Sequence, residues 1–163
     1  MLGRKPIRPK RKQAAGTGVT LLFIAVCIPQ QAPVVAQTAG NPKDILIIAN
    51  RDVDTNSVSL TVVRDLFLKV RKAWGNGKRA IPTNSSSEQL RNDFRKRVLN
   101  MDDMSEKRYW EDLKVKYGQN EPPVFSNSLK AVFKLSGAVS YVYRKDYLPN
   151  VVKIILVIPS NGN

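Results

Sequence analysis

Uninterrupted apolar runs predict the strands of this protein. The first, Asp44–Ala49, is apolar after its first residue, which is typical of a strand that is buried on both faces. A short apolar piece, Ala80–Thr83, predicts a second strand. The runs Ala138–Tyr143 and Val151–Ile158 predict two more near the C-terminus.

Apolar residues recur at helical spacing in four other segments, and these segments predict helices. The helical stripes are Leu60, Val63, Leu66, Phe67 and Val70; Leu90, Phe94 and Val98; Tyr109, Trp110, Leu113 and Tyr117; and Leu129, Val132 and Phe133. The resulting order is strand, helix, strand, three helices, two strands. This order predicts an α/β fold, a small three-layer-type domain with helices packed on a mostly apolar sheet.

Polar residues and glycines at the ends of these segments support the boundaries. The candidate N-caps are Ser59 or Thr61, Asp103 with Glu106 at capping-box spacing, and Ser126 or Asn127. Gly118 and Gly137 stand where the last two helices are expected to stop. Trp74, next to Gly75, predicts an apolar plug that closes a basic loop.

The N-terminus has the layout of a secretory signal. A basic segment, Arg4–Lys12, precedes the apolar stretch Val19–Ile28 and the small-residue run Ala32–Ala36. The apolar stretch is well short of the roughly 20 residues that span a bilayer, so we expect cleavage, after Ala36. An uncleaved anchor is the alternative. Lipidation at Cys27 is discounted because bulky Val26 precedes it.

Export defines the expected domain organisation and location. We expect a signal peptide at 1–36, a linker at 37–43, one domain at 44–159 and a tail at 160–163. The mature protein is expected to be periplasmic or secreted, with membrane contact only through the signal peptide. Nucleic acid is therefore not an expected partner, although a basic domain alone would fit one.

Composition narrows the chemistry. The 163-residue chain contains no histidine and a single cysteine, which removes the usual zinc sites and His-activated nucleophiles. The paired carboxylates Asp102–Asp103 and Glu111–Asp112 are adjacent in sequence and point apart, so each is interpreted as a cap or a surface charge. We expect a non-enzyme with no catalytic residues, no metal site and no cofactor.

The charge favours anionic partners. The chain carries 27 basic and 13 acidic residues, a net charge of +14. Six of the basic residues lie in the predicted signal peptide, and without them 21 basic residues remain, a net charge of +8. The predicted mature domain is therefore still basic enough to prefer phosphate, anionic glycans or lipid headgroups.

The polar stretch Thr83–Ser87 is the candidate binding site. It joins a predicted strand to a predicted helix, and the first backbone amides of a helix favour an oxyanion. The alternative is that the serines only cap the helix, because Ser85 with Glu88 and Ser86 with Gln89 have capping-box spacing. Lys78, Arg79 and Arg91 lie nearby in sequence and would raise the local anion concentration.

Four segments, in order, resemble one lobe of the phosphate-binding proteins of ABC importers, which have the type II periplasmic binding fold. They are Leu60–Phe67 with Trp74–Gly77; Ile81–Ser87 followed by Phe94; Tyr109–Trp110; and Gly137–Val142. The resemblance covers roughly residues 45–142. It implies a periplasmic-binding-protein-like domain and an exported, non-catalytic solute-binding protein in phosphate transport.

The resemblance also indicates the site residues and partners. It implies that Ser85, Ser86 and Ser87 face phosphate or a similar oxyanion, with Thr83 and Asn84 shaping the loop. An ABC importer or another envelope protein is the implied partner. The family's arginine and its Ser-Gly-Thr run are replaced here, and only one lobe is present, so binding is expected to be weak. The alternative function is a single-lobe scaffold or interaction module in the cell envelope with no small ligand.

Overall fold

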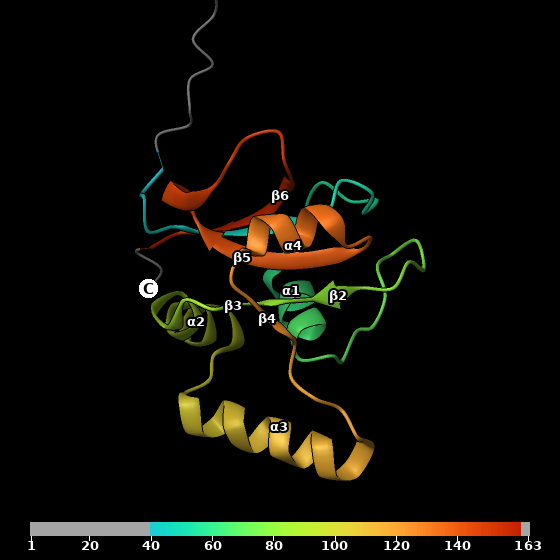
Figure 1. Ribbon diagram of the computed structural model, residues 1–163. Helices are drawn as coiled ribbons and strands as arrows, with labels where there is room; N and C mark the ends of the chain where they lie inside the picture. The colour runs from blue at the N-terminus through green and yellow to red at the C-terminus, as the bar shows by residue number, and fades with distance from the viewer. Residues whose placement is uncertain (1–39, 161–163) are drawn as a thin grey trace, which may run out of the picture. The chain divides into compact units, whose positions relative to one another are not determined.

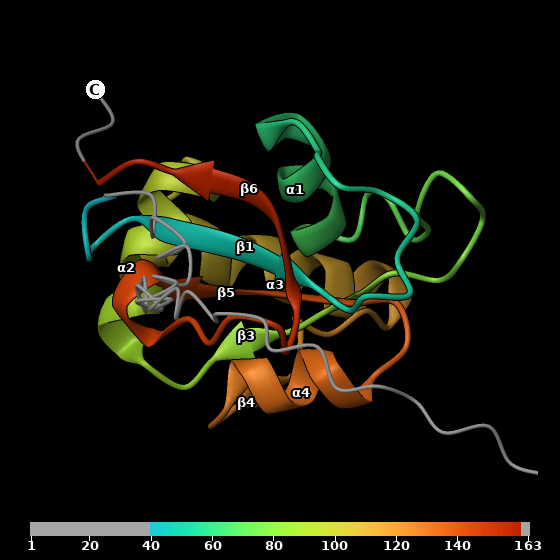
Figure 2. The ribbon, with the colours of Figure 1, turned by 90° about the horizontal axis from the view of Figure 1, so that it is seen from above.

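The computed structural model describes residues 40–160 and contains a mixed four-stranded sheet (Figure 1). Its strands, in the order β2-β5-β1-β6, are β2 (Ile81–Pro82), β5 (Ala138–Tyr143), β1 (Ile45–Ala49) and β6 (Lys153–Ile158). β1 runs antiparallel to both β5 and β6, and β2 runs parallel to β5. Seen from above, β1 lies between β5 and β6 (Figure 2). The predicted signal peptide, with Cys27 and the cleavage site, lies outside the described residues.

Helices cover both faces of the sheet, so the predicted α/β class and three-layer arrangement are confirmed. α1 (Leu60–Phe67) and α2 (Glu88–Phe94) pack on one face, and α2 continues as a π-helical turn, η1 (Arg95–Leu99). α4 (Ser128–Lys134) packs on the other face. α3 (Asp103–Tyr117) lies beyond the α1–α2 layer (Figure 1). The short elements are β3 (Asn84–Ser85), β4 (Val124–Phe125) and the 3₁₀ turn η2 (Arg144–Asp146).

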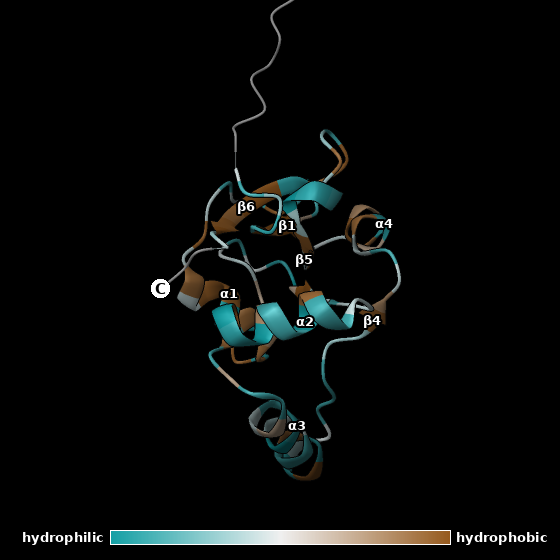
Figure 3. Cartoon of the chain, turned by 90° about the vertical axis from the view of Figure 1, so that its left-hand side faces the viewer, coloured by the Kyte–Doolittle hydropathy of each residue, from teal (hydrophilic) through white to brown (hydrophobic). Residues whose placement is uncertain are grey.

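β1 is buried on both faces, as its uninterrupted apolar run predicts. Ile45 and Ile47 belong to the core beneath α1 and α2, whereas Leu46 and Ile48 belong to the core beneath α4. This division follows from the strand period of two, which sends successive side chains to opposite faces. In Figure 3, α2 is coloured mostly as hydrophilic, whereas β6 is coloured mostly as hydrophobic.

Aromatic rings fill the core between the sheet and α2. The rings of Phe94 and Tyr141 stack with centroids 3.8 Å apart, and Phe67 contacts Phe94 at 4.6 Å. Trp74 is buried in its loop, as expected of an apolar plug. Its indole Nε1 donates a hydrogen bond to the Gly137 carbonyl oxygen at 2.9 Å, which ties the loop to the start of β5.

The helix ends confirm some predicted caps and correct others. Ser59 caps α1, Asn127 caps α4, and Gly118 ends α3 in the left-handed conformation, all as predicted. The cap of α3 is Asp102 rather than Asp103, because the Asp102 carboxylate accepts the Ser105 amide at 2.7 Å.

Three of the predicted apolar stripes include residues that are exposed in the structure. In α3 only Trp110 is buried, and Tyr117 is 70% exposed because no described residue covers the C-terminal end of this helix. Phe133 of α4 is also exposed, and α1 ends at Phe67, which leaves Val70 outside the helix on the surface.

Asp44 fastens the start of β1 to the end of the described chain. Its carboxylate accepts hydrogen bonds from Arg144 Nε at 3.2 Å and from the Ser160 amide at 2.9 Å. Burial by itself raises the pKa of Asp44, but the Ser160 amide and Arg144 outweigh burial and hold the pKa below its usual 3.8. The carboxylate therefore stays ionised in the folded protein.

Candidate functional site

Thr83, the first residue of the predicted site, lies inside the protein. Its side chain is fully buried, and both its amide and its hydroxyl donate to the Val139 carbonyl oxygen. The Thr83 carbonyl oxygen in turn accepts from Ser140 Oγ at 2.9 Å. These bonds hold the loop against β5, so Thr83 positions its neighbours and does not face a pocket.

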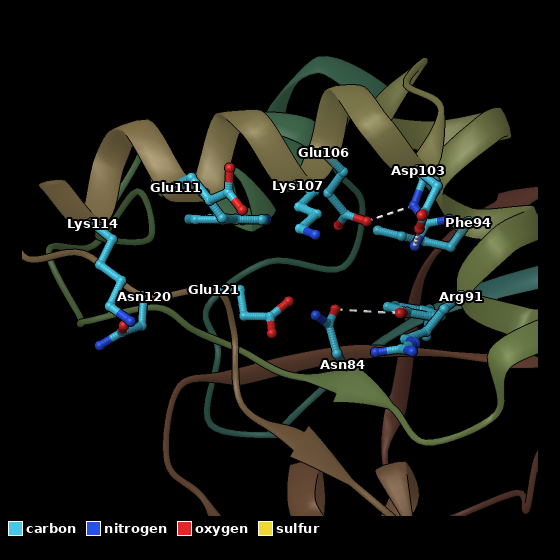
Figure 4. Close-up of a pocket in the computed structure, with 13 residues that line it drawn as sticks. Asn84, Arg91, Phe94, Asp103, Glu106, Lys107, Glu111, Lys114, Asn120 and Glu121 are labelled. Carbon is cyan, nitrogen blue, oxygen red and sulfur yellow. Dashed lines mark hydrogen bonds and ion pairs between the residues drawn. The ribbon is translucent and has the colours of Figure 1, made fainter.

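Asn84 points away from the three serines. Its Oδ1 accepts a hydrogen bond from the Tyr141 hydroxyl at 3.3 Å, and its Nδ2 donates to the Pro122 carbonyl oxygen at 3.4 Å. Figure 4 shows Asn84 in the wall of the pocket beside α3. The structure therefore separates Asn84 from Ser85–Ser87, which line a different pocket.

The three serines differ in burial and in the hydrogen bonds that they make. Ser85 is buried, and its Oγ accepts the Ser87 amide at 3.2 Å. Ser87 is the N-cap of α2, because its Oγ accepts the Leu90 amide at 3.4 Å. Ser86 is exposed, and its amide donates to the Phe125 carbonyl oxygen at 3.1 Å. Capping therefore occurs, but at Ser87 and not in the predicted boxes that start at Ser85 or Ser86.

Parallel pairing of β3 with β4 brings two helix starts together. Ser85 is paired with Phe125, so the residues that follow each strand, Ser86–Ser87 and Ser126–Ser128, lie side by side. Between them is a pocket of about 270 Å³, into which the N-terminal ends of α2 and α4 open. We refer to it as the serine pocket. Its other lining residues are Leu90, Leu129, Val142, Tyr143 and Asp146.

The second polar cluster, Ser126–Ser128, is a part of this pocket that the sequence did not identify as a site. Its small polar residues lie directly before a predicted helix, and this position indicates helix caps for Ser126 and Asn127 but not a binding site. Asn127 is indeed the cap of α4, with Oδ1 accepting the Lys130 amide at 2.8 Å. The pairing partner of β3 could not be inferred from local pattern.

The electrostatics of the serine pocket are only partly suited to an anion. The first-turn amides of two helices favour negative charge, but Asp146 contributes a carboxylate and no lysine or arginine lines this pocket. Lys78 pairs with Asp52 at 3.0 Å, and Arg91 lines the pocket beside α3. Burial and the hydrogen bond to Asp93 raise the pKa of Tyr143, which keeps its hydroxyl protonated as a donor.

A larger pocket of about 450 Å³ lies between α3 and the face formed by α2 and β5 (Figure 4). We call it the α3 pocket. Arg95 closes one end, with Nε 2.5 Å from Glu106 and Nη2 3.1 Å from Asp103, and so joins η1 to α3. Its lining residues are Asn84, Arg91, Phe94, Arg95, Asp103, Glu106, Lys107, Trp110, Glu111, Lys114, Asn120, Glu121 and Tyr141.

The fold, a layered α/β domain, is similar to part of solved phosphate-binding proteins of ABC transporters. A protein from Clostridium perfringens, described as a phosphate ABC transporter substrate-binding protein and solved with bound phosphate, is similar at 15% identity. Its TM-score is 0.52 over 70% of this chain and 45% of that protein. An ABC-type phosphate transport receptor from Vibrio cholerae is similar at 10% identity, with a TM-score of 0.53 over 70% and 46%. PstS from Borrelia burgdorferi is similar at 11% identity, with a TM-score of 0.51 over 68% and 46%.

These likenesses show the fold. The chain spans less than half the length of each of these solved proteins. Neither the family models nor the sequences of curated proteins match this chain. Within residues 40–160, no helix has the length and apolar character needed to cross a membrane, and no group of three or more His, Cys, Asp or Glu residues is placed to hold a metal ion.

Proposed function

We propose that the protein is an exported, non-catalytic solute-binding protein that binds phosphate or another oxyanion weakly at the serine pocket. The observation that carries this proposal is the meeting of two serine-rich helix starts in one pocket, on a fold shared with receptors of which one was solved with phosphate. Ser85, Ser86 and Ser87 would contribute the α2 side. Thr83 and Asn84 would shape the loop from inside, as their hydrogen bonds to Val139 and Pro122 support.

Weak binding follows from the composition of the pocket. A single lobe leaves a bound anion partly in water, where solvent competes for its hydrogen bonds and salt screens its charge. Asp146 lines the pocket and Glu88 lies in the first turn of α2, so two carboxylates oppose the helix dipole. An ABC importer component or another envelope protein would complete the site by covering its open side.

Thermal unfolding of the full chain against inorganic phosphate tests the proposal. A ligand that binds only the folded state raises the melting temperature as its concentration exceeds Kd, so a rise is expected over a sodium chloride series of equal ionic strength. Ser86→Asp places a carboxylate in the pocket at an exposed side chain and should abolish the rise. Ser57→Asp, at an exposed serine outside the pocket, should preserve it. If phosphate raises the melting temperature no more than chloride does, ligand binding is not the function.

The hydrogen bonds of the serines favour a second function, a scaffold or interaction module in the cell envelope. The hydroxyls of Ser85 and Ser87 already accept backbone amides, as they would if the loop served only to start α2. In that case changing Ser85, Ser86 and Ser87 together to alanine lowers the stability by about 1 kcal/mol, the worth of one cap. At millimolar concentration, phosphate would then raise the melting temperature no more than sodium chloride of equal ionic strength does, before or after the change.

A further inference from the structure

The α3 pocket is separate from the serine pocket. The two pockets share no lining residue, and the α3 pocket is the larger of the two. Its walls come from α2, α3, the loop around Asn120 and Glu121, and the floor residues Asn84 and Tyr141 (Figure 4). Binding at the α3 pocket would be independent of phosphate binding at the serine pocket.

Five charged side chains that line the α3 pocket have no ion pair or side-chain hydrogen bond within residues 40–160: Arg91, Lys107, Glu111, Lys114 and Glu121. Three of these, Arg91, Lys107 and Glu121, surround the opening of the pocket. They come from α2, α3 and the loop after α3, and Figure 4 shows them directed at one opening. The carboxylates of Asp103 and Glu106 are different, because Arg95 neutralises both. The pocket therefore presents charged groups of both signs without an ion pair: three cations, Arg91, Lys107 and Lys114, and two carboxylates, Glu111 and Glu121.

Two buried donors in the same walls also lack acceptors. Arg91 Nε and the indole Nε1 of Trp110 are closed off from solvent and have no hydrogen-bond partner within the described part of the chain. Trp110 is only 8% exposed. A buried donor without an acceptor is uncommon in folded proteins and costs free energy. An oxygen-bearing ligand, with a small outward adjustment of α3, would supply the missing acceptors.

The remaining walls are aromatic. Phe94 and Tyr141 stack against each other in the floor, and Trp110 forms part of the roof. Burial raises the pKa of Tyr141, so its hydroxyl stays neutral and donates to Asn84. Aromatic walls with a few converging charged groups are typical of sites for small organic ligands.

We propose that the α3 pocket binds a small zwitterion that carries a carboxylate and a protonated amine, a free α-amino acid. The guanidinium of Arg91, assisted by Lys107, binds the carboxylate, since a guanidinium matches the geometry of a carboxylate with paired hydrogen bonds. Glu121 binds the ammonium group. The side chain of the ligand lies against Trp110 and Phe94. An inorganic oxyanion would place a like charge next to the Glu121 carboxylate and would bring no cation into the pocket.

Thermal unfolding and calorimetric titration of the full chain test this assignment. The probes are glycine, L-leucine, L-glutamine, L-arginine and L-glutamate, each up to about 10 mM, and the stabilisation expected follows the ratio of concentration to Kd. Propionate and ethylamine each carry one of the two charges and serve as ligand controls. At least one amino acid should bind, and propionate and ethylamine should bind at least about tenfold more weakly.

Variants connect the binding to the named residues. Arg91→Gln and Glu121→Gln should each weaken binding of the amino acid by about tenfold or more, as expected for losing one charged contact. Arg108→Gln and Glu88→Gln remove like charges outside the pocket and should leave Kd unchanged within about twofold. Circular dichroism melts of all four variants show whether each remains folded.

Two results would overturn the proposal. One is that no amino acid of the panel binds to the folded wild-type chain. The other is that binding persists unchanged in Arg91→Gln and Glu121→Gln. Failure here is distinguishable from failure of the proposed function, because phosphate binding at the serine pocket responds to Ser86→Asp and not to Glu121→Gln. If Arg91→Gln abolishes phosphate binding instead, the α3 pocket is an oxyanion site and the zwitterion assignment is wrong.

Discussion

Gly137 offers a sharp test of the packing that holds the basic loop to the sheet. Its φ of +74° is a conformation that side-chain-bearing residues rarely adopt, and a Cβ built on it would lie 2.2 Å from the Arg79 carbonyl oxygen. Gly77 has a similar φ of +80° but open space around it. The change Gly→Ala at the two positions therefore imposes the same backbone strain and differs only in the steric contact.

The expected losses of folding stability in the two glycine variants follow from these contacts. Gly77→Ala should cost about 1 kcal/mol, the strain of a left-handed alanine. Gly137→Ala adds a clash with backbone, which must separate the loop from β5. The Gly137 carbonyl oxygen accepts both Trp74 Nε1 at 2.9 Å and the Ile81 amide at 3.1 Å, and each bond is worth about 1 kcal/mol. The total loss for Gly137→Ala is then about 3 kcal/mol or more.

Urea unfolding of the two variants and the wild type, followed by circular dichroism, measures the difference as a shift in midpoint at constant m-value. With Trp110→Phe in the background, which leaves Trp74 as the single tryptophan, fluorescence reports whether the loop separates locally before the sheet unfolds. If the two glycine variants lose equal stability, or if Gly137→Ala is tolerated, then Gly137 does not approach Arg79 closely and the loop is not anchored as described.

Three further predictions concern stability and processing. Because the pKa of Asp44 is lowered in the folded state, ionised Asp44 stabilises the fold above pH 3.8, and this stabilisation is lost as the pH falls through the lower, folded-state pKa. Between about pH 5 and 2, the urea midpoint should therefore fall less steeply with pH in Asp44→Asn than in the wild type. Equal slopes in the two proteins would contradict this prediction. Ser87→Ala should cost about 1 kcal/mol as a lost cap while Ser86→Ala costs almost nothing, and the reverse order in thermal melts would place the cap elsewhere. On secretion, mass spectrometry should find a mature chain that starts directly after Ala36; a full-length membrane-bound chain would show that the segment is an anchor.

Local patterns predicted most elements because each pattern has a direct physical cause. The uninterrupted apolar run of β1 predicted burial on both faces, and Ser59, Asn127 and Gly118 marked helix ends through hydrogen-bonding and backbone preferences. The strand order β2-β5-β1-β6 was not predictable in this way. It depends on pairing between segments about 90 residues apart, such as Ile47 with Tyr141, and no local pattern encodes such a partner.

The α3 helix shows a second limit of periodicity. Tyr109, Trp110, Leu113 and Tyr117 share a face, as their spacing predicts, but only Trp110 is buried. Periodicity states which side chains lie together on a helix. It does not predict which of these side chains another element of the fold buries. Here Arg95 joins the start of α3 to η1 through Asp103 and Glu106, and Tyr117 is left exposed at the far end.

The alternation of side chains along a strand constrains which residues of the candidate site can lie together. A polar run that begins in a strand cannot direct all its side chains to one site, because successive residues of a strand face opposite sides. The structure shows this alternation: Asn84 lines the α3 pocket, and Ser85, its neighbour in β3, lines the serine pocket. Strand geometry was therefore sufficient to separate Asn84 from Ser85. Only the parallel partner of β3, which brings Ser126–Ser128 to the same pocket, required the structure.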